Sequence, residues 1–276
     1  MTNTIRSKLA NWFSYGALLV FAFAAIFPVL WALVSSFKSS LDITAMPPKI
    51  IFSPTLEHYN YVFSQGIAEP LINSAIVVAG TVILVFVAGC PAAYGLARFK
   101  TKLTKGISGF VFGMRFLPTV AFALPLFLVF SEIGLTGTRI GLILSYQMFA
   151  LPTVLFMMWS FFVNIPPEVE EAAKIDGCGH LGVFFKIALP MVAPGIAAAL
   201  IICAIFAWNH FFLALILGGN VEVATMTLNS FTGGEDIAMQ WGPLYAYSVM
   251  ITAPIIVLGY SASNYLIKGL SGDTEL

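Results

Sequence analysis

Long apolar segments recur along the whole chain, and shorter polar segments separate them. A helix needs about 20 predominantly apolar residues to cross the hydrocarbon core of a bilayer, and each of these segments is long enough to do so. The pattern therefore predicts an all-α protein with six transmembrane helices. The expected spans are residues 15–34, 74–96, 107–130, 141–162, 194–217 and 244–266.

The composition agrees with a membrane domain. Hydrophobic residues make up 59% of the 276 residues and charged residues 9%, whereas soluble domains are about 25% charged. No polar segment is long enough for a large soluble domain, so we expect residues 1–276 to form a single membrane domain. The net charge is zero and the basic residues do not form one block, which argues against nucleic-acid binding. The three cysteines are widely separated, and their spacing indicates neither a metal site nor a disulfide framework.

The distribution of lysine and arginine indicates how the chain is oriented, because cytoplasmic loops are enriched in these residues. With the N-terminus inside, only Lys38, Lys49 and Arg139 lie in outer loops. We therefore expect both termini and residues 163–189 in the cytoplasm, and residues 218–241 outside. The basic residues expected inside are Arg6, Lys8, Arg98, Lys100, Lys102, Lys105, Lys174, Lys186 and Lys268.

The inner segment 163–189 is polar and carries the start and end signals of two short helices. Pro166 or Pro167 suits a first helical turn, and the glutamates that follow lie at the positive end of the helix dipole. Gly177 can adopt the left-handed conformation that ends a helix. A second short helix can follow and end before Pro190. The segment therefore predicts a helix, a sharp turn and a second helix.

An alternative is that this segment is an amphipathic loop lying on the lipid headgroups. Helices that lie in the interface are rich in lysine and arginine on their polar face. The first turn here is acidic instead, and an anionic leaflet would repel it. A protein partner with a basic groove explains these charges better.

A specific spacing runs through this segment: Glu171-Ala172-Ala173, three residues, Gly177, nine residues, then Ile187-x-Leu189-Pro190. This spacing resembles the EAA loop of ABC-importer permeases. Further motifs are residues 92–99, 170–177, Trp208-Asn209 and 268–270. They agree with the carbohydrate-importer branch of that family and are similar to the smaller maltose permease subunit, and the similarity extends over essentially the whole chain.

The resemblance implies that the helix-turn-helix is a coupling loop, which docks into a cleft on an ATPase subunit and transmits its closure to the membrane helices. By this resemblance, Glu171 would pair with a basic group on the ATPase and Gly177 would make the turn. Ala172 and Ala173 would permit close approach. The full set of implied coupling residues is Glu170, Glu171, Ala172, Ala173, Asp176, Gly177, Ile187, Leu189 and Pro190.

The same resemblance implies several partners. They are a second permease subunit, a pair of ATPase subunits and an extracytoplasmic solute-binding protein. We expect the second permease subunit to be a different polypeptide, although the sequence leaves a homodimer open. The loop 218–241 is rich in Thr, Asn, Ser and Gly and lacks Lys and Arg, and it is expected to contact the binding protein. The chain would lie in the cytoplasmic membrane of a bacterium or archaeon.

Sequence motifs for catalysis are missing. The phosphate-binding pattern G-x-x-x-x-G-K-[ST] is absent from the chain. We therefore expect a transport subunit that is not itself an enzyme and has no cofactor or metal of its own, with ATP and Mg²⁺ bound by the partner ATPase.

Six polar or aromatic residues within the predicted spans are candidates for the substrate pathway. A charge such as that of Arg115 is costly in the bilayer and should face protein or water, unless it reaches the headgroups or binds the carbonyls freed near Pro118. Aromatic and amide groups suit sugar rings and hydroxyls, but buried polar groups also bridge helices. The candidates are Arg115, Tyr146, Gln147, Trp208, Asn209 and His210.

Taken together, the sequence predicts the permease subunit of an ATP-driven importer for a carbohydrate or related polyol. An importer of another solute, such as a phosphorylated polyol, is an alternative in which Arg115 could be the charge partner. An ion-coupled secondary transporter is a further alternative, which should show carboxylates within the membrane and inverted repeats. The predicted spans contain neither Asp nor Glu.

Overall fold

The computed structural model describes residues 2–99, 101–116, 118–233 and 239–271, and these form helices and connecting turns without a β-strand. The predicted all-α class is confirmed. The chain divides into two compact units, one made of residues 1–67 with 228–252 and the other of residues 68–227 with 253–276. The second unit contains the predicted coupling loop.

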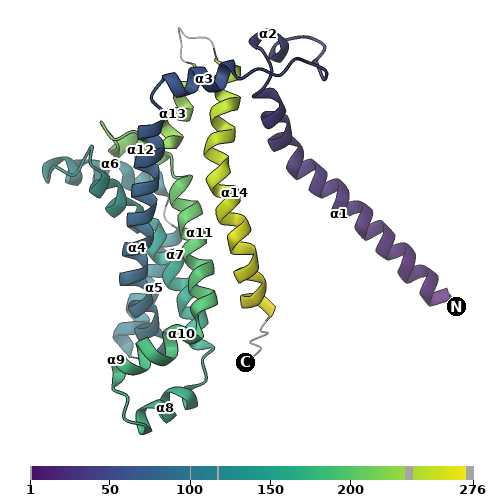
Figure 1. Cartoon of the computed structure of the whole chain (residues 1–276). Coiled ribbons are helices and arrows are strands. Elements are labelled where there is room, and N and C mark those ends of the chain that lie inside the picture. The colour runs from purple at the N-terminus through teal and green to yellow at the C-terminus, as the bar shows by residue number, and fades with distance from the viewer. Residues whose placement is uncertain (1, 100, 117, 234–238, 272–276) are drawn as a thin grey trace. The chain divides into compact units, whose positions relative to one another are not determined.

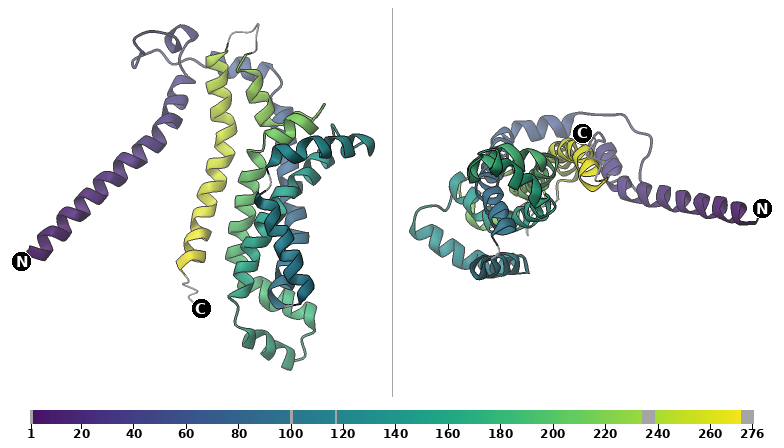
Figure 2. Two further views of the ribbon diagram at one scale, coloured as in Figure 1. Left: turned by 180° about the vertical axis from the view of Figure 1, so that it is seen from behind. Right: turned by 90° about the horizontal axis from the view of Figure 1, so that it is seen from below.

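Three long helices form the centre of the second unit. They are α4 (Ala68–Arg98), α7 (Arg139–Val163) and α11 (Ala193–Trp208), and each packs against the other two (Figures 1 and 2). Glycines allow this close packing: a Cβ at Gly195 would overlap the ring of Phe161. Small residues at helix contacts are the usual device in membranes, where lipid provides no hydrophobic drive for association.

The third predicted span is broken. The segment 107–130 was expected to be one helix, but α5 (Lys102–Gly113) and the single turn η1 (Met114–Phe116) are separated from α6 (Thr119–Glu132) by a bend of 105°. Pro118 immediately precedes α6. Proline cannot donate a backbone hydrogen bond, and it disfavours helical geometry in the residue before it, which explains why the helix stops here.

The fifth predicted span is also interrupted. Residues 194–217 were expected to form one helix, but α11 ends at Trp208 and α12 (Phe212–Leu217) follows after a short break. A bend of 76° separates α11 from the helical stretch 180–191 that precedes it. The polar residues Asn209 and His210 therefore lie at a break in the helix and not within a continuous one.

Helix length and apolar composition agree with six spans. Four helical stretches are long and apolar enough to cross a membrane, and each of the two bent pairs can form one further span. The four stretches are Asn11–Ser35, Ala68–Arg98, Arg139–Val163 and Trp241–Ser261. The last of these belongs to α14 (Trp241–Ser271).

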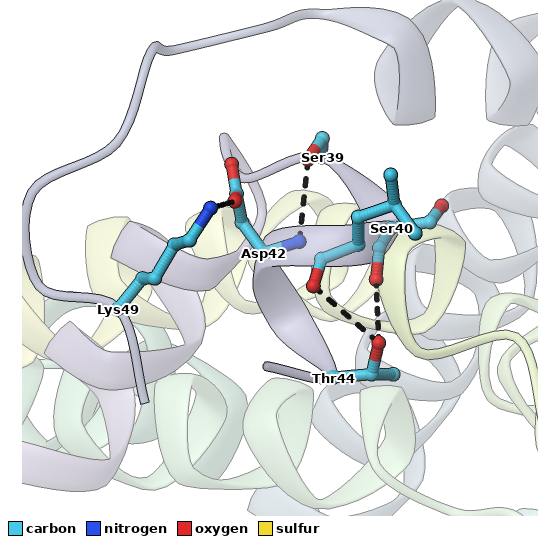
Figure 3. Close-up of polar contacts among 6 residues, drawn as sticks. Ser39, Ser40, Asp42, Thr44 and Lys49 are labelled. Carbon is cyan, nitrogen blue, oxygen red and sulfur yellow. Dashed lines mark hydrogen bonds and ion pairs between the residues drawn. The ribbon is translucent and has the colours of Figure 1, made fainter. Parts of the chain in front are cut away.

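The first unit contains α1 (Thr2–Ser35), α2 (Ser40–Ile43) and α3 (Glu57–Ser64). The Ser39 hydroxyl caps α2 by accepting a hydrogen bond of 3.3 Å from the Asp42 backbone N–H, and Lys49 pairs with the Asp42 carboxylate (Figure 3). The hydrogen bond from Lys49 is the largest cause that holds the pKa of Asp42 below its ordinary value. Lys38 is buried, and its Nζ lies 4.5 Å from the ring centroid of Trp31. Cation–π contact and an ion pair thus order this connection.

Candidate coupling site

The predicted helix-turn-helix is present. Helix α8 (Pro167–Ile175) begins with a proline at its first position, where the missing N–H removes no hydrogen bond. Gly177 has φ of +90°. The Gly177 N–H donates to the Lys174 carbonyl at 3.1 Å, and the Cys178 N–H donates to the Ala173 carbonyl at 3.0 Å. This pair of bonds is the Schellman motif, in which glycine supplies the left-handed residue that ends a helix.

The second half of the site is longer than predicted. Helix α9 (His180–Val183) continues through the π-helical turn η2 (Phe184–Ala188) into α10 (Leu189–Met191). The helical path therefore passes Pro190, where the sequence predicted an end. Proline tolerates the first turn of a helical segment, and here it falls within the short α10 directly after the wider π turn.

Glu170 lies on the inner face of α8 and contacts α4. Its carboxylate Oε1 lies 2.7 Å from Nη2 of Arg98 and accepts a hydrogen bond of 2.8 Å from Arg98 Nε. The Tyr94 hydroxyl donates to Oε2 at 3.0 Å, and Arg98 Nη2 also donates to the Ile165 carbonyl at 3.2 Å. Glu170 is only 3% exposed. Its charge is thus satisfied within this chain.

The outer face of α8 and the turn are exposed. Glu171 and Ala172 face outward, whereas Ala173 is buried beside Glu170. Two apolar side chains flank the turn: Ile175 is 86% exposed, and Leu181, which the sequence did not single out, is 75% exposed. Of the remaining predicted coupling residues, Ile187 and Leu189 are half-buried, and the exposed ones are Asp176, Gly177 and Pro190.

A cavity of about 470 Å³ lies between the end of α4 and the helix-turn-helix. Its lining mixes apolar and charged groups, and it includes both the buried Glu170 and the exposed Glu171. Other lining residues are Tyr94, Arg98, Lys174, His180, Leu181 and Phe184.

Two of the candidate pathway residues meet. The hydroxyl of the buried Tyr146 donates to the backbone carbonyl of His210 at 2.9 Å, and the two rings lie edge to face with centroids 4.9 Å apart. The His210 ring also lies 5.1 Å from that of Phe206 and 5.8 Å from that of Phe149. An imidazole among aromatic rings therefore occupies the break between α11 and α12.

The other candidate pathway residues have different neighbours. Gln147 Nε2 donates to the Thr81 carbonyl at 3.2 Å, which links α7 to α4. Asn209 is exposed and donates to the Ile205 carbonyl of its own helix at 2.8 Å, while Trp208 is buried. Arg115 is exposed on η1, and its guanidinium carbon lies 5.4 Å from the ring centroid of Phe156.

The loop 218–241, which was expected to lie outside the membrane and to contact the binding protein, is partly helical. Helix α13 (Ala224–Ser230) occupies its middle, and the Gly218 N–H donates to the Ala214 carbonyl at 2.7 Å. Residues 234–238 of this loop lie outside the described residues. The loop therefore contains a short helix as well as turns.

Comparison with known proteins places these features in one family. Residues 85–271 match the family described as the binding-protein-dependent transport system inner membrane component. The trehalose transport system permease protein of Mycobacterium tuberculosis is 34% identical over 251 residues, which cover 90% of this chain and 91% of that protein. The diacetylchitobiose uptake system permease protein of Streptomyces coelicolor is 34% identical over 248 residues, covering 89% of this chain and 82% of that protein.

The fold is also shared with a solved structure. A chain from the crystal structure of a bacterial ABC transporter that imports the acidic polysaccharide alginate superposes with a TM-score of 0.79, at 20% identity, and covers 94% of this chain and 96% of that one. The family match spans the coupling site and both interrupted spans, and the two relatives match a larger share of the chain. This chain therefore belongs to the family of inner membrane components of binding-protein-dependent transport systems.

Proposed function

We propose that this chain is a permease subunit of an ABC importer for a carbohydrate or related polyol and that a separate ATPase subunit drives it through the coupling site. The observation that carries the proposal is the Schellman-terminated helix-turn-helix, which presents Glu171 and the apolar Ile175 and Leu181 to solvent. The substrates named for the two relatives, trehalose and diacetylchitobiose, support a carbohydrate substrate.

The exposed face of the coupling site has the chemistry of a docking surface. Apolar side chains exposed beside a sharp turn favour burial in a partner's groove. Glu171 adds a negative charge, which gives complementarity to a basic group on the ATPase. Ala172 adds little bulk on the same exposed face. Closure of the ATPase pair would therefore move α8 and the helices joined to it.

The partner set follows from the same proposal. The chain lacks a phosphate-binding loop of its own, so ATP and Mg²⁺ would be bound and ATP hydrolysed by the ATPase subunits, with no cofactor in this chain. The loops rich in lysine and arginine support an orientation with both termini and the coupling site in the cytoplasm. The external loop with α13 would then face the solute-binding protein. A second, different permease subunit would complete the translocation pathway.

The pathway in this subunit would pass the break between α11 and α12. The exposed Asn209 offers a hydrogen-bonding side chain at this break, and the half-buried ring of His210 lies beside it, next to the ring of the buried Tyr146. Sugars are bound through hydroxyl hydrogen bonds and the apolar face of the ring. Trp208 and Gln147 flank this region in sequence and help to fix the helices around it.

A charged solute such as a phosphorylated polyol is the alternative substrate. Arg115 favours it, since its guanidinium is exposed on η1 within a predicted span. An ion-coupled secondary transporter is no longer supported, because the chain belongs to a binding-protein-dependent family.

The test is ATP-dependent uptake into proteoliposomes that contain this chain with the companion permease, ATPase and binding protein of its system. Labelled trehalose, diacetylchitobiose and a polyol phosphate are offered in turn. We expect the wild-type importer to take up a neutral sugar. This uptake should be lost in Glu171→Ala and Gly177→Pro and kept in the exposed control Glu168→Gln. Normal uptake in both loop variants would contradict the proposal, and uptake of the phosphate alone would favour the alternative substrate.

A further inference from the structure

Helix α4 is bonded at both of its ends to segments that are far away in the sequence. At one end, Arg98 and Tyr94 hold Glu170 of the coupling site, 72 and 76 residues further along the chain. At the other end, Asn73 and Ser74 hold residues 222 and 224, 149 and 150 residues further along. We name residues 222–224, which lie in the external loop just before and at the start of α13, the outer segment.

The contacts at the outer segment are buried and directional. Asn73 Nδ2 donates to the Glu222 carbonyl at 2.9 Å, and the Ala224 N–H donates to Ser74 Oγ at 2.8 Å. Asn73 and Ser74 are 2% and 4% exposed. Asn73 Oδ1 also accepts a hydrogen bond of 2.8 Å from Arg139 Nε, which orients the amide. A buried polar group that loses its partner is costly, so these bonds keep the outer segment attached to α4.

The contacts at the coupling site are stronger still. The Glu170 carboxylate is buried and receives hydrogen bonds from both Arg98 and Tyr94. Breaking a buried ion pair leaves an uncompensated charge away from water. Helix α8 therefore cannot move away from the end of α4 without a large penalty, and the two move together.

The part of α4 between these contacts is long enough to connect the two faces of a membrane. From Ser74 to Tyr94 the helix advances about 30 Å, which is close to the thickness of the hydrocarbon core. Its buried face, which includes Val77, Val85 and Ala93, packs along α7 and α11. The helix is continuous from Ala68 to Arg98, including at Pro91.

We propose that α4 is a strut that carries movement between the coupling site and the outer segment, with the Arg98–Glu170–Tyr94 cluster and the Asn73 and Ser74 contacts as its two fixed ends. The inference rests on the proposed function, since it requires an ATPase on one side and a binding protein on the other. Coupling between two sites is reciprocal. Engagement of the outer segment would therefore favour the position of α8 that ATPase closure requires.

The competing route is α7, which leads directly into the coupling site through residues 164–166. If α7 carries the movement, the contacts of α4 only stabilise the fold. The two routes differ in one respect: the strut requires that a defect at Glu170 and a defect at Ser74 impair the same step.

The experiment measures how strongly the binding protein stimulates the ATPase activity of the importer in proteoliposomes. Glu170→Gln removes the charge but keeps the shape of the side chain, and Ser74→Ala removes the acceptor for the Ala224 N–H. Each should lower the stimulation by at least about fivefold, the lower end of typical coupling between sites. Matched controls are Glu168→Gln, exposed on the same helix, and Ser145→Ala, a buried serine that donates to the Leu142 carbonyl of its own helix.

The double variant is the decisive comparison. If one strut joins both ends, the double variant of Glu170→Gln and Ser74→Ala should lose no more ATPase stimulation than the single variant with the larger loss, because one substitution already breaks the connection. The charge-reversed pair Arg98→Glu with Glu170→Arg should recover part of the stimulation lost in either single variant. Purified amounts and ATPase binding equal to those of the wild type would show that these are not folding defects.

Four results would overturn the inference. Stimulation within twofold of the wild type in Glu170→Gln would assign the movement to α7, as would additive losses in the double variant. A loss of stimulation in Glu171→Ala with none in Glu170→Gln would overturn the strut but keep the proposed function. A wild-type complex without any stimulation would contradict the proposed function, and the strut with it.

Discussion

The two faces of α8 carry neighbouring glutamates with different surroundings. Glu170 on the inner face is 3% exposed and bonded to Arg98 and Tyr94, while Glu171 on the outer face is exposed. Consecutive residues of a helix point about 100° apart, so adjacent positions can face a core and solvent respectively. One acidic pair thus serves two purposes: the inner charge holds the coupling site to this chain, and the outer charge remains available to a partner.

This difference implies that changes on the two faces separate stability from coupling. Inner-face variants should lower the stability of the chain, because they leave buried polar groups without partners. Outer-face variants should leave stability unchanged and weaken association with the ATPase.

The largest loss of stability is expected for Glu170→Ala. It leaves the guanidinium of Arg98 half-buried beside the Ile165 carbonyl without its carboxylate, and breaking a buried pair in this way costs about 3–5 kcal/mol. Thermal unfolding of the purified chain in detergent should show a clearly lowered midpoint. Glu168→Ala on the exposed side serves as the control, and an equal midpoint for the two variants would contradict the burial of Glu170.

A smaller loss is expected for Tyr94→Phe, which removes the hydroxyl that donates to Glu170 Oε2 and leaves the ring in place. Hydrogen bonds to charged groups contribute about 1.5–3 kcal/mol. The same unfolding measurement should place this variant between Glu170→Ala and the wild type. Tyr61→Phe, at a ring that is 41% exposed, is the control and should unfold like the wild type.

Gly177→Ala tests the turn between the two helices. Gly177 has φ of +90° and a Cβ there would meet no atom within 4 Å, so the cost is conformational and not steric. A left-handed conformation costs an L-residue about 1–2 kcal/mol. Gly182→Ala is the matched control, because this glycine lies within α9 at an ordinary helical φ, where alanine stabilises by about 0.5–1 kcal/mol. Equal unfolding midpoints for the two variants would contradict the strain assigned to Gly177.

The smallest effect on stability is expected for Glu171→Ala. Substitutions at exposed positions outside special features usually change stability by less than about 0.5 kcal/mol. Uptake by the reconstituted importer should nevertheless fall, since the outer face would lose its charge. A lowered unfolding midpoint together with normal uptake in Glu171→Ala would reverse the assignment of the two faces.

The sequence predicted the helix-turn-helix well because its signals are local. The proline start and the Gly177 turn lie within 11 residues of one another, and their backbone preferences do not depend on the rest of the fold. The inward direction of Glu170 could not be predicted in the same way. Its partner Arg98 is 72 residues away, and only the packing of α4 against the coupling site brings them together.

The sequence predicted six apolar segments, but the expectation that residues 107–130 and 194–217 each form one continuous helix was wrong. Apolar length identifies a segment that can cross a bilayer, and it does not register a break such as the one at Pro118 or the one after Trp208. The second break coincides with Asn209 and His210, which the sequence had singled out as polar residues in an apolar segment. A polar pair of this kind therefore indicates irregular backbone, which within a membrane faces protein or a water-filled cavity and not lipid.

We expect the outer face of α8 to bind the ATPase and the inner face to hold α8 to this chain. The most direct test is the affinity of the purified ATPase subunit for the detergent-solubilised permease, compared between wild type, Glu171→Ala and Glu170→Gln. Glu171→Ala should weaken binding by at least about tenfold, equivalent to about 1.4 kcal/mol, and Glu170→Gln should change it by less than about threefold. Unchanged binding in Glu171→Ala, or a larger loss in Glu170→Gln than in Glu171→Ala, would contradict this expectation.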